Sequence, residues 1–204
     1  TLSRIDEKQE LENYQNEVLS KARETMSGDD LAYIEEDLRS PCTQEIAVFR
    51  AFADIVEKAA DAVVIIDTAP TGHTLLLLDS TESYHKEVER TKGQTPLSVQ
   101  HLLPRLRDAS LTEVVIVTLP EATPVFEASR LREDLVRAGI YTKWWVVNQC
   151  LSLTDTRDPM LLARAEAEKN WLEKVHRLSG GYTVALPWLE DPSVEHIVKL
   201  ADRP

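Results

Sequence analysis

Residues 63–74 read VVIIDTAPTGHT, and this stretch says more about function than any other part of the sequence. Four aliphatic residues follow one another at 63–66 without polar alternation, a pattern typical of a strand that is covered on both faces, as strands of parallel sheets are. Asp67 stands where this predicted strand ends. Because open α/β sheets bind ligands at the carboxyl ends of their strands, Asp67 is the first candidate for a functional residue.

An unpaired carboxylate at the end of a buried strand would cost several kcal/mol, so we expect Asp67 to have a partner. Two kinds of partner fit the sequence. Backbone N–H groups of the turn at residues 68–74 can cap the carboxylate, as they do for many acidic turn residues. A hydrated Mg²⁺ ion is the other candidate, because this ion prefers one or two carboxylates together with waters and phosphate oxygens.

Three helix patterns precede this stretch, and the chain after Asp67 alternates between strand and helix patterns. The predicted strands lie at 114–119, 144–148 and 182–186, and the predicted helices at 11–22, 31–38, 41–56, 124–138, 159–178 and 194–200. This alternation predicts an α/β fold, a single domain over residues 1–204, with a mainly parallel twisted sheet and helices on both faces. A polar stretch at 79–96 breaks the pattern and is either a functional loop or a surface excursion.

One helix start is unusually clear in the sequence. Ser40-Pro41 is typical of a capping residue followed by the first helical position, and it places Cys42 in the first turn. The following apolar residues have helical spacing and predict one buried face, made of Ile46, Phe49, Ala53 and Val56.

Composition excludes several classes of protein. The net charge of -12 argues against nucleic acid as a partner, since no basic surface is evident to neutralise phosphates. The sequence contains no apolar run long enough to cross a bilayer, so we expect a soluble, cytoplasmic chain without direct membrane insertion. Cys42 and Cys150 lie far apart and form no CxxC pair, which predicts two reduced thiols.

A chain that binds nucleotide through Asp67 should also carry a glycine-rich phosphate loop. The six glycines form no G-x-x-x-x-G-K-[ST] motif, so the usual backbone donors and lysine for β- and γ-phosphates are missing. Two interpretations fit this gap. Either the chain does not hydrolyse nucleotide, or it is a fragment from which the first strand and the phosphate loop have been removed.

Two motifs resemble a known family. The stretch DTAPTGHT at 67–74 resembles the signature of the arsenical pump-driving ATPases and of the related ATPases that deliver tail-anchored membrane proteins, and SPCT at 40–43 resembles the arsenical branch. The resemblance covers essentially the whole chain, which looks like the second half of a tandem bacterial enzyme, starting downstream of the phosphate loop of that half. It implies a deviant P-loop NTPase fold and favours the interpretation as a fragment.

The resemblance also implies nucleotide-site roles. Asp67 would hold Mg²⁺ through water, and the segment from Asp67 to Thr74 would be a switch that reports the γ-phosphate of ATP, with Gly72 allowing its backbone to re-aim. Asn148, at a strand end, would read adenine, and Pro187 would pack near the base.

A second site is implied for trivalent arsenic or antimony, with Cys42 and His73 as ligands and the other ATPase half completing it. A thiolate suits such a thiophilic ion, and a helix amino terminus lowers a thiol pKa. Without the motif, we would interpret Cys42 as a small buried hydrophobic residue and His73 as a side chain that hydrogen-bonds within its own turn. Cys150 is predicted to be an ordinary buried thiol.

The resemblance therefore predicts part of an ATP-hydrolysing enzyme that drives extrusion of arsenite or antimonite and is inactive alone. Its expected partners are the other ATPase half, or a homodimer partner, and an integral membrane arsenite pump that would recruit the chain to the inner face of the membrane. Two alternatives remain. A targeting ATPase for tail-anchored membrane proteins is disfavoured, because the chain has only Met26 and Met160 and lacks a CxxC pair. A metalloid-binding module without hydrolysis is the other.

Overall fold

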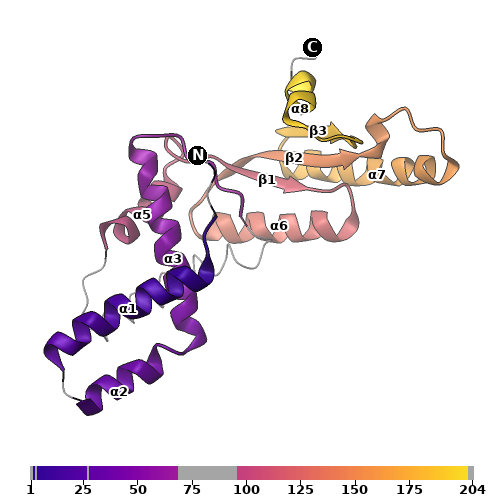
Figure 1. The fold of residues 1–204 in the computed structure, drawn as a ribbon. Coiled ribbons are helices and arrows are strands. Elements are labelled where there is room, and N and C mark those ends of the chain that lie inside the picture. The colour runs from indigo at the N-terminus through magenta and orange to yellow at the C-terminus, as the bar shows by residue number, and fades with distance from the viewer. Residues whose placement is uncertain (1, 3, 27, 69–95, 202–204) are drawn as a thin grey trace. The chain divides into compact units, whose positions relative to one another are not determined.

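The computed structural model describes residues 2, 4–26, 28–68 and 96–201 (Figure 1). The chain divides into two compact units, Thr1–Leu111 and Thr112–Pro204. Each unit has its own hydrophobic core and is described by itself below. The prediction of a single domain over 1–204 stays a prediction.

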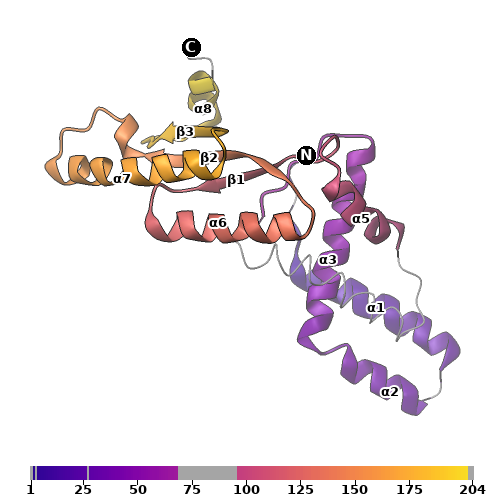
Figure 2. The ribbon, with the colours of Figure 1, turned by 180° about the vertical axis from the view of Figure 1, so that it is seen from behind.

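The first unit is helical in the part that the structure describes (Figure 2). Its elements are α1 (Glu7–Thr25), α2 (Gly28–Asp37), α3 (Pro41–Glu57), the short 3₁₀ helix η1 (Lys58–Ala60) and α5 (Leu97–Arg107). Helix α3 packs against α1 and α5, and α2 packs against α1. The core forms between α3 and α5, where the predicted face of Ile46, Phe49, Ala53 and Val56 is buried together with Val99 and Leu102.

The start of α3 follows the prediction in position but not in mechanism. Ser40 has the extended backbone of an N-cap and Pro41 is the first helical residue, yet the Ser40 side chain makes no capping hydrogen bond to the backbone. Instead, Ser40 Oγ lies 3.1 Å from Thr43 Oγ1, and the Thr43 hydroxyl donates to the Asp37 carbonyl at 3.2 Å. These bonds join the end of α2 to the start of α3.

The buried strand predicted at 63–66 is wrong for this structure. Residues 63–68 form neither helix nor strand, and the side chains of Val63 and Ile65 are both 92% exposed. A strand needs hydrogen bonds to a neighbouring strand, and those that the structure describes pair among themselves in the second unit. A run of aliphatic residues favours burial, but it forms a strand only where a neighbouring strand lies beside it and can exchange backbone hydrogen bonds.

The second unit is built on a three-stranded parallel sheet in the order β1-β2-β3, with β1 at Val114–Thr118, β2 at Thr142–Cys150 and β3 at Thr183–Pro187. Helix α6 (Ala122–Arg137) connects the first two strands. The 3₁₀ helix η2 (Leu151–Leu153) and helix α7 (Pro159–Leu178) connect the second and third, and α8 (Val194–Ala201) follows. The predicted α/β class with a parallel sheet is confirmed.

Helices α6 and α7 pack on one face of this sheet (Figure 1). Their core contains Ile116, Val125, Trp145, Val147 and Val175, each at most 2% exposed. Alternate residues of the strands point the other way and are more accessible, with Val115 46% and Val117 63% exposed. The α6/α7 layer therefore holds the sheet from one side and fixes where the strand ends lie.

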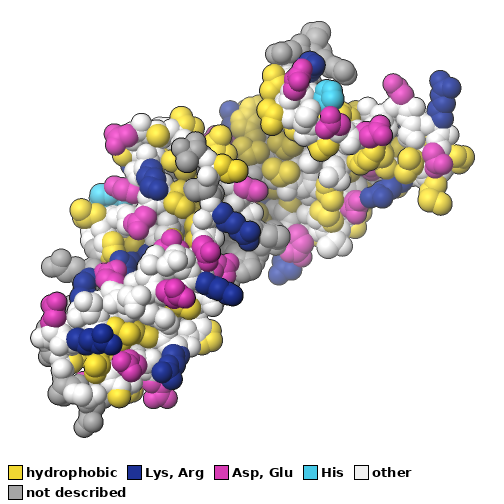
Figure 3. Space-filling view, viewed as in Figure 1, with side chains coloured by type: hydrophobic (Ala, Val, Ile, Leu, Met, Phe, Trp, Pro, Cys, Tyr) yellow, Lys and Arg dark blue, Asp and Glu magenta, His cyan; other side chains and the backbone are white. Residues whose placement is uncertain are grey.

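The surface agrees with the charge of the sequence. On the face seen in Figure 3, acidic side chains are spread over the chain, and lysines and arginines do not gather into one patch. No helix among residues 4–26, 28–68 and 96–201 is both long and apolar enough to cross a membrane.

Candidate functional site

The structure describes four of the predicted site residues, namely Cys42, Asp67, Asn148 and Pro187. Asp67 is exposed, which removes the expected cost of an unpaired buried carboxylate and leaves the group open to a hydrated ion. Gly72 and His73 lie outside the described residues. Cys42 is exposed in the first turn of α3, so the interpretation as a buried hydrophobic residue does not hold.

Asn148 and Pro187 are brought to the same end of the second unit's sheet. Asn148 lies near the carboxyl end of β2, and Pro187 is the last residue of β3. Val147 pairs with Ala185, and Cys150 pairs with Pro187. Since the strands are parallel, both candidate residues lie at the edge where α/β sheets bind ligands.

The pairing at this edge is irregular. Three steps along β2, from Val147 to Cys150, match only two along β3, so β2 carries a bulge at Asn148 and Gln149. Gln149 has a φ of 59°, in the left-handed region that non-glycine residues seldom adopt. The Gln149 N–H donates to Asn148 Oδ1 at 2.9 Å, which fixes the amide plane of Asn148. Bulges of this kind re-aim side chains next to functional sites.

Glu168 of α7 supports the turn after the bulge, and the sequence analysis missed it. Its side chain is 3% exposed, and its carboxylate accepts hydrogen bonds from the N–H groups of Leu151 at 3.2 Å and Ser152 at 2.9 Å. The available signal was its spacing: Glu168 shares a helical stripe with Ala165, Leu172 and Val175, so a carboxylate lies on an apolar face. A buried acid in such a stripe requires a partner.

Cys150 is the buried thiol that the sequence predicted. It is 0% exposed, and its Sγ lies 3.4 Å from the Val147 carbonyl oxygen. Burial, with a smaller contribution from the Glu168 charge, raises the pKa of Cys150 to about 11. The group is therefore a protonated thiol at neutral pH and a poor ligand for metalloids.

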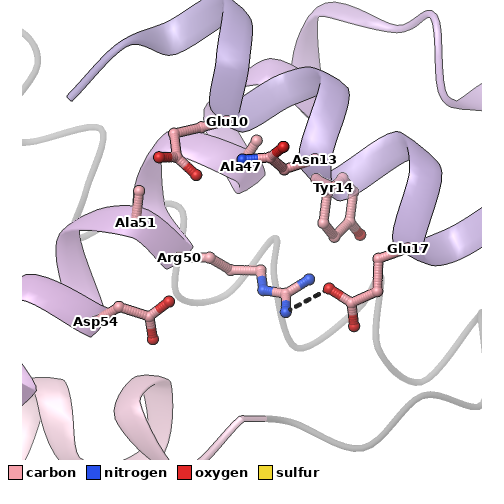
Figure 4. A pocket seen from close by; sticks show the side chains of 8 residues that line it. All are labelled: Glu10, Asn13, Tyr14, Glu17, Ala47, Arg50, Ala51 and Asp54. Atoms are coloured by element: carbon pink, nitrogen blue, oxygen red, sulfur yellow. Dashed lines mark hydrogen bonds and ion pairs between the residues drawn. The ribbon is translucent and has the colours of Figure 1, made fainter.

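The first unit contains a small polar pocket of about 180 Å³ between α1 and α3 (Figure 4). Arg50 Nη2 donates to Glu17 Oε2 at 2.9 Å, and the guanidinium lies 5.2 Å from the centre of the Tyr14 ring. The pKa of Glu17 is lowered, chiefly by a hydrogen bond from Lys21 and further by Arg50, while burial opposes the shift. Among the residues that the structure describes, no group of three or more His, Cys, Asp and Glu side chains is arranged to hold a metal ion.

Comparison with known proteins gives the family. The sequence profile of the anion-transporting ATPases matches residues 1–104 and again 94–192, which together are most of the chain. The chain belongs to the anion-transporting ATPase family. Within this family it is similar to the arsenical pump-driving ATPase of Escherichia coli, with 42% identity over 207 residues that cover 98% of the chain and 34% of the relative. The enzyme of the same name from Acidiphilium multivorum is 42% identical over 201 residues, again covering 98% of the chain and 34% of the relative.

The chain is also similar, at lower identity, to ATPase get3 of Schizosaccharomyces japonicus, which is 27% identical over 161 residues that cover 63% of this chain and 50% of that protein. The chain thus spans about a third of the length of the arsenical pump-driving relatives that it matches, at 34%.

Proposed function

We propose that the chain is part of an ATP-hydrolysing subunit that drives extrusion of arsenite or antimonite. The observation that carries this proposal is the 42% identity, along 98% of the chain, with two arsenical pump-driving ATPases. The motif residues Cys42 and Asp67 are both accessible, as ligands must be. The partners that we propose are a second ATPase half and an integral membrane pump protein.

The nucleotide roles are those that the family resemblance implies, and the chemistry of the residues is compatible with them. The exposed carboxylate of Asp67 suits a hydrated Mg²⁺, which in phosphoryl transfer neutralises charge on the phosphate oxygens. Gly72 and its neighbours would re-aim the backbone when the γ-phosphate leaves. Asn148 presents an amide that can donate and accept at a base edge, and Pro187 offers an apolar contact at the same sheet edge. Adenine recognition by this pair is therefore part of the proposal.

The metalloid role rests on the contrast between the two cysteines. Cys42 is exposed in the first turn of a 17-residue helix, where an ion can reach its sulfur, whereas Cys150 is buried with a raised pKa. We propose Cys42 and His73 as ligands of trivalent arsenic or antimony. A single cysteine and a single histidine bind weakly, so the site needs further ligands from the other half.

The experiment is an ATPase assay of the full-length protein with and without antimonite. We expect antimonite to stimulate wild-type hydrolysis and Cys42→Ser to lose the stimulation while keeping the basal rate. Cys150→Ala is the matched control and should keep the stimulation. Equal stimulation in the Cys42→Ser variant would reject the metalloid part of the proposal.

The targeting of tail-anchored membrane proteins is the second candidate, and the similarity to ATPase get3 favours it. The lower identity, 27% against 42%, ranks it behind arsenical transport. Incubating the full-length protein with a peptide of a tail-anchored membrane segment separates the two. Retention of that peptide, together with no response to antimonite, would replace the first proposal by the second.

A further inference from the structure

We infer that Glu168 is a positioning residue for base recognition, acting through the turn that carries Asn148. The inference rests on the proposed nucleotide function, because it concerns the same nucleotide base that Asn148 is proposed to bind. It says that a buried carboxylate on α7 holds the bulge and turn at the end of β2, and that this support orients Asn148 toward a nucleotide base.

The contacts of Glu168 are directed at one turn. Its two carboxylate oxygens accept from successive backbone N–H groups, Oε1 from Leu151 at 3.2 Å and Oε2 from Ser152 at 2.9 Å. These two residues begin η2, and the N–H groups at a helix start have no partners within the helix. The carboxylate therefore acts as a cap delivered from a residue 16 or 17 positions away in the sequence.

The turn held by Glu168 is continuous with the candidate base site. Asn148 and Gln149 form the bulge, Cys150 follows, and Leu151 is the first residue bonded to Glu168. On the other side, the Cys150 carbonyl accepts from the N–H of Trp188 at 3.1 Å, the residue after Pro187. Asn148 thus lies three residues before the first amide that Glu168 holds, and Pro187 precedes Trp188, which is hydrogen-bonded to Cys150, the residue next to that amide.

The strained backbone explains why such support is needed. Gln149 holds a left-handed φ of 59° without the freedom of glycine, a conformation that persists only where the surroundings enforce it. A buried charge is likewise retained only where its hydrogen bonds are satisfied. Glu168, at 3% exposed, meets this condition by bonding the two amides that follow the strained segment. Removing the carboxylate releases the turn, and the Asn148 amide then loses its fixed direction.

The test uses hydrogen–deuterium exchange of the full-length protein, read on the peptide that contains residues 148–152. Protection of this peptide is titrated with Mg-ATP and, separately, with Mg-GTP, which gives an apparent Kd at this site alone. The variants are Asn148→Ala, Glu168→Ala, Glu168→Gln and the double variant Asn148→Ala/Glu168→Ala. Glu173→Ala is the matched control, because Glu173 is an exposed acid on the same helix, paired with Arg177.

We expect the wild type and Glu173→Ala to prefer ATP over GTP. Asn148→Ala and Glu168→Ala should each reduce that preference about tenfold, and the double variant should lose no more than Asn148→Ala, since residues acting as one unit are not additive. Glu168→Gln keeps one acceptor oxygen, so its loss should be smaller, about threefold. Unliganded Glu168→Ala should also exchange faster at residues 151 and 152 than the wild type.

The outcomes separate the inference from the proposed function. If Asn148→Ala abolishes the preference and Glu168→Ala does not, or if the two losses add in the double variant, the inference is overturned and the base site stands. An unchanged preference in Asn148→Ala overturns both. Should Glu168→Ala fail to fold, Glu168→Gln decides the matter, and a wild-type preference in that variant overturns the inference.

Discussion

Cys150 and Pro187 are register partners on neighbouring parallel strands, and the Cys150 carbonyl oxygen also accepts the N–H of Trp188 at 3.1 Å. This pairing comes directly after the bulge at Asn148 and Gln149, so the sheet regains its register immediately beyond the candidate base-reading residue. At the carboxyl ends of β2 and β3, regular strand pairing therefore lies on both sides of the bulge.

The two thiols should differ sharply in reactivity. The pKa of Cys150 is raised from 9.0 to about 11, which lowers its thiolate fraction at pH 8 about a hundredfold, since each pH unit is a factor of ten. Cys42 is exposed. Brief treatment with iodoacetamide followed by mass spectrometry should label Cys42 and spare Cys150. Comparable labelling of both residues in the folded protein would contradict the burial of Cys150.

The same thiol gives a pH dependence with a defined sign. A group whose pKa is raised on folding stabilises the protein fully below its unfolded pKa, and this contribution is lost as pH rises through the folded value. For Cys150 the window lies between pH 9 and about 11. In that window the Cys150→Ala variant should lose less stability with rising pH than the wild type does, as measured by urea unfolding. Parallel pH profiles of the two proteins would contradict this expectation.

The strained residue of the bulge predicts a stabilising substitution. Gln149 has a φ of 59°, which costs an L-residue about 1 to 2 kcal/mol and costs glycine little. After the entropy that glycine loses on folding, Gln149→Gly should stabilise the second unit by about 0.5 kcal/mol. Val184→Gly, at an ordinary strand position, is the control and should destabilise it. Urea unfolding measures both, and a loss of stability in Gln149→Gly would show that this backbone is not strained.

The ion pair of the polar pocket should contribute modestly to the first unit. Arg50 bonds Glu17 and lies over the Tyr14 ring, and its side chain is 21% exposed. Arg50→Ala should lower the free energy of unfolding by about 1 kcal/mol, whereas the exposed pair of Lys169 and Glu166 should give less than about 0.5 kcal/mol in Lys169→Ala. Because the folded pKa of Glu17 is lowered from 4.5, the Arg50 contribution should fade as pH falls below that value. Equal losses in both variants would contradict the assignment.

Much of the second unit could be predicted from the residues that start and end its helices. Asp158-Pro159 predicts the start of α7, and the helix does begin at Pro159 with the Asp158 side chain accepting from the N–H groups of Met160 and Leu161. Gly139 directly follows the helix predicted at 124–138 and has a φ of 77°. Such signals are local, because the residue that stops or caps an element lies within a few positions of it.

Other features could not be read locally. The run at 63–66 resembles a buried strand, yet pairing depends on residues elsewhere in space, and the described backbone there is neither strand nor helix. The left-handed residue of the bulge is Gln149 and not a glycine, so the sequence gives no local signal for the bulge. Glu168 caps a turn 16 or 17 residues earlier in the chain, so its role appears only when α7 is folded onto the sheet. In each case a long-range contact, and not a sequence pattern, decides the outcome.

The isolated chain should be inactive as an enzyme. It contains no G-x-x-x-x-G-K-[ST] motif, and these residues alone lack the backbone cradle and lysine for β- and γ-phosphates. We expect purified residues 1–204 to show no Mg²⁺-dependent release of phosphate from ATP. A longer protein that also carries a phosphate loop, as we propose, should turn over when it is assayed alongside. Sustained turnover by the isolated chain would mean that its phosphate site is built in another way.

The central claim is that Asp67 holds Mg²⁺ together with ATP, and hydrogen–deuterium exchange of the full-length protein tests it most directly. The measured quantity is protection of the peptide spanning residues 60–75, with ATP in the presence of Mg²⁺ or of a chelator. We predict protection by Mg-ATP in the wild type and in the control variant Asp61→Asn, and its loss in Asp67→Asn or with the chelator. Equal protection of the wild type and Asp67→Asn would contradict the account.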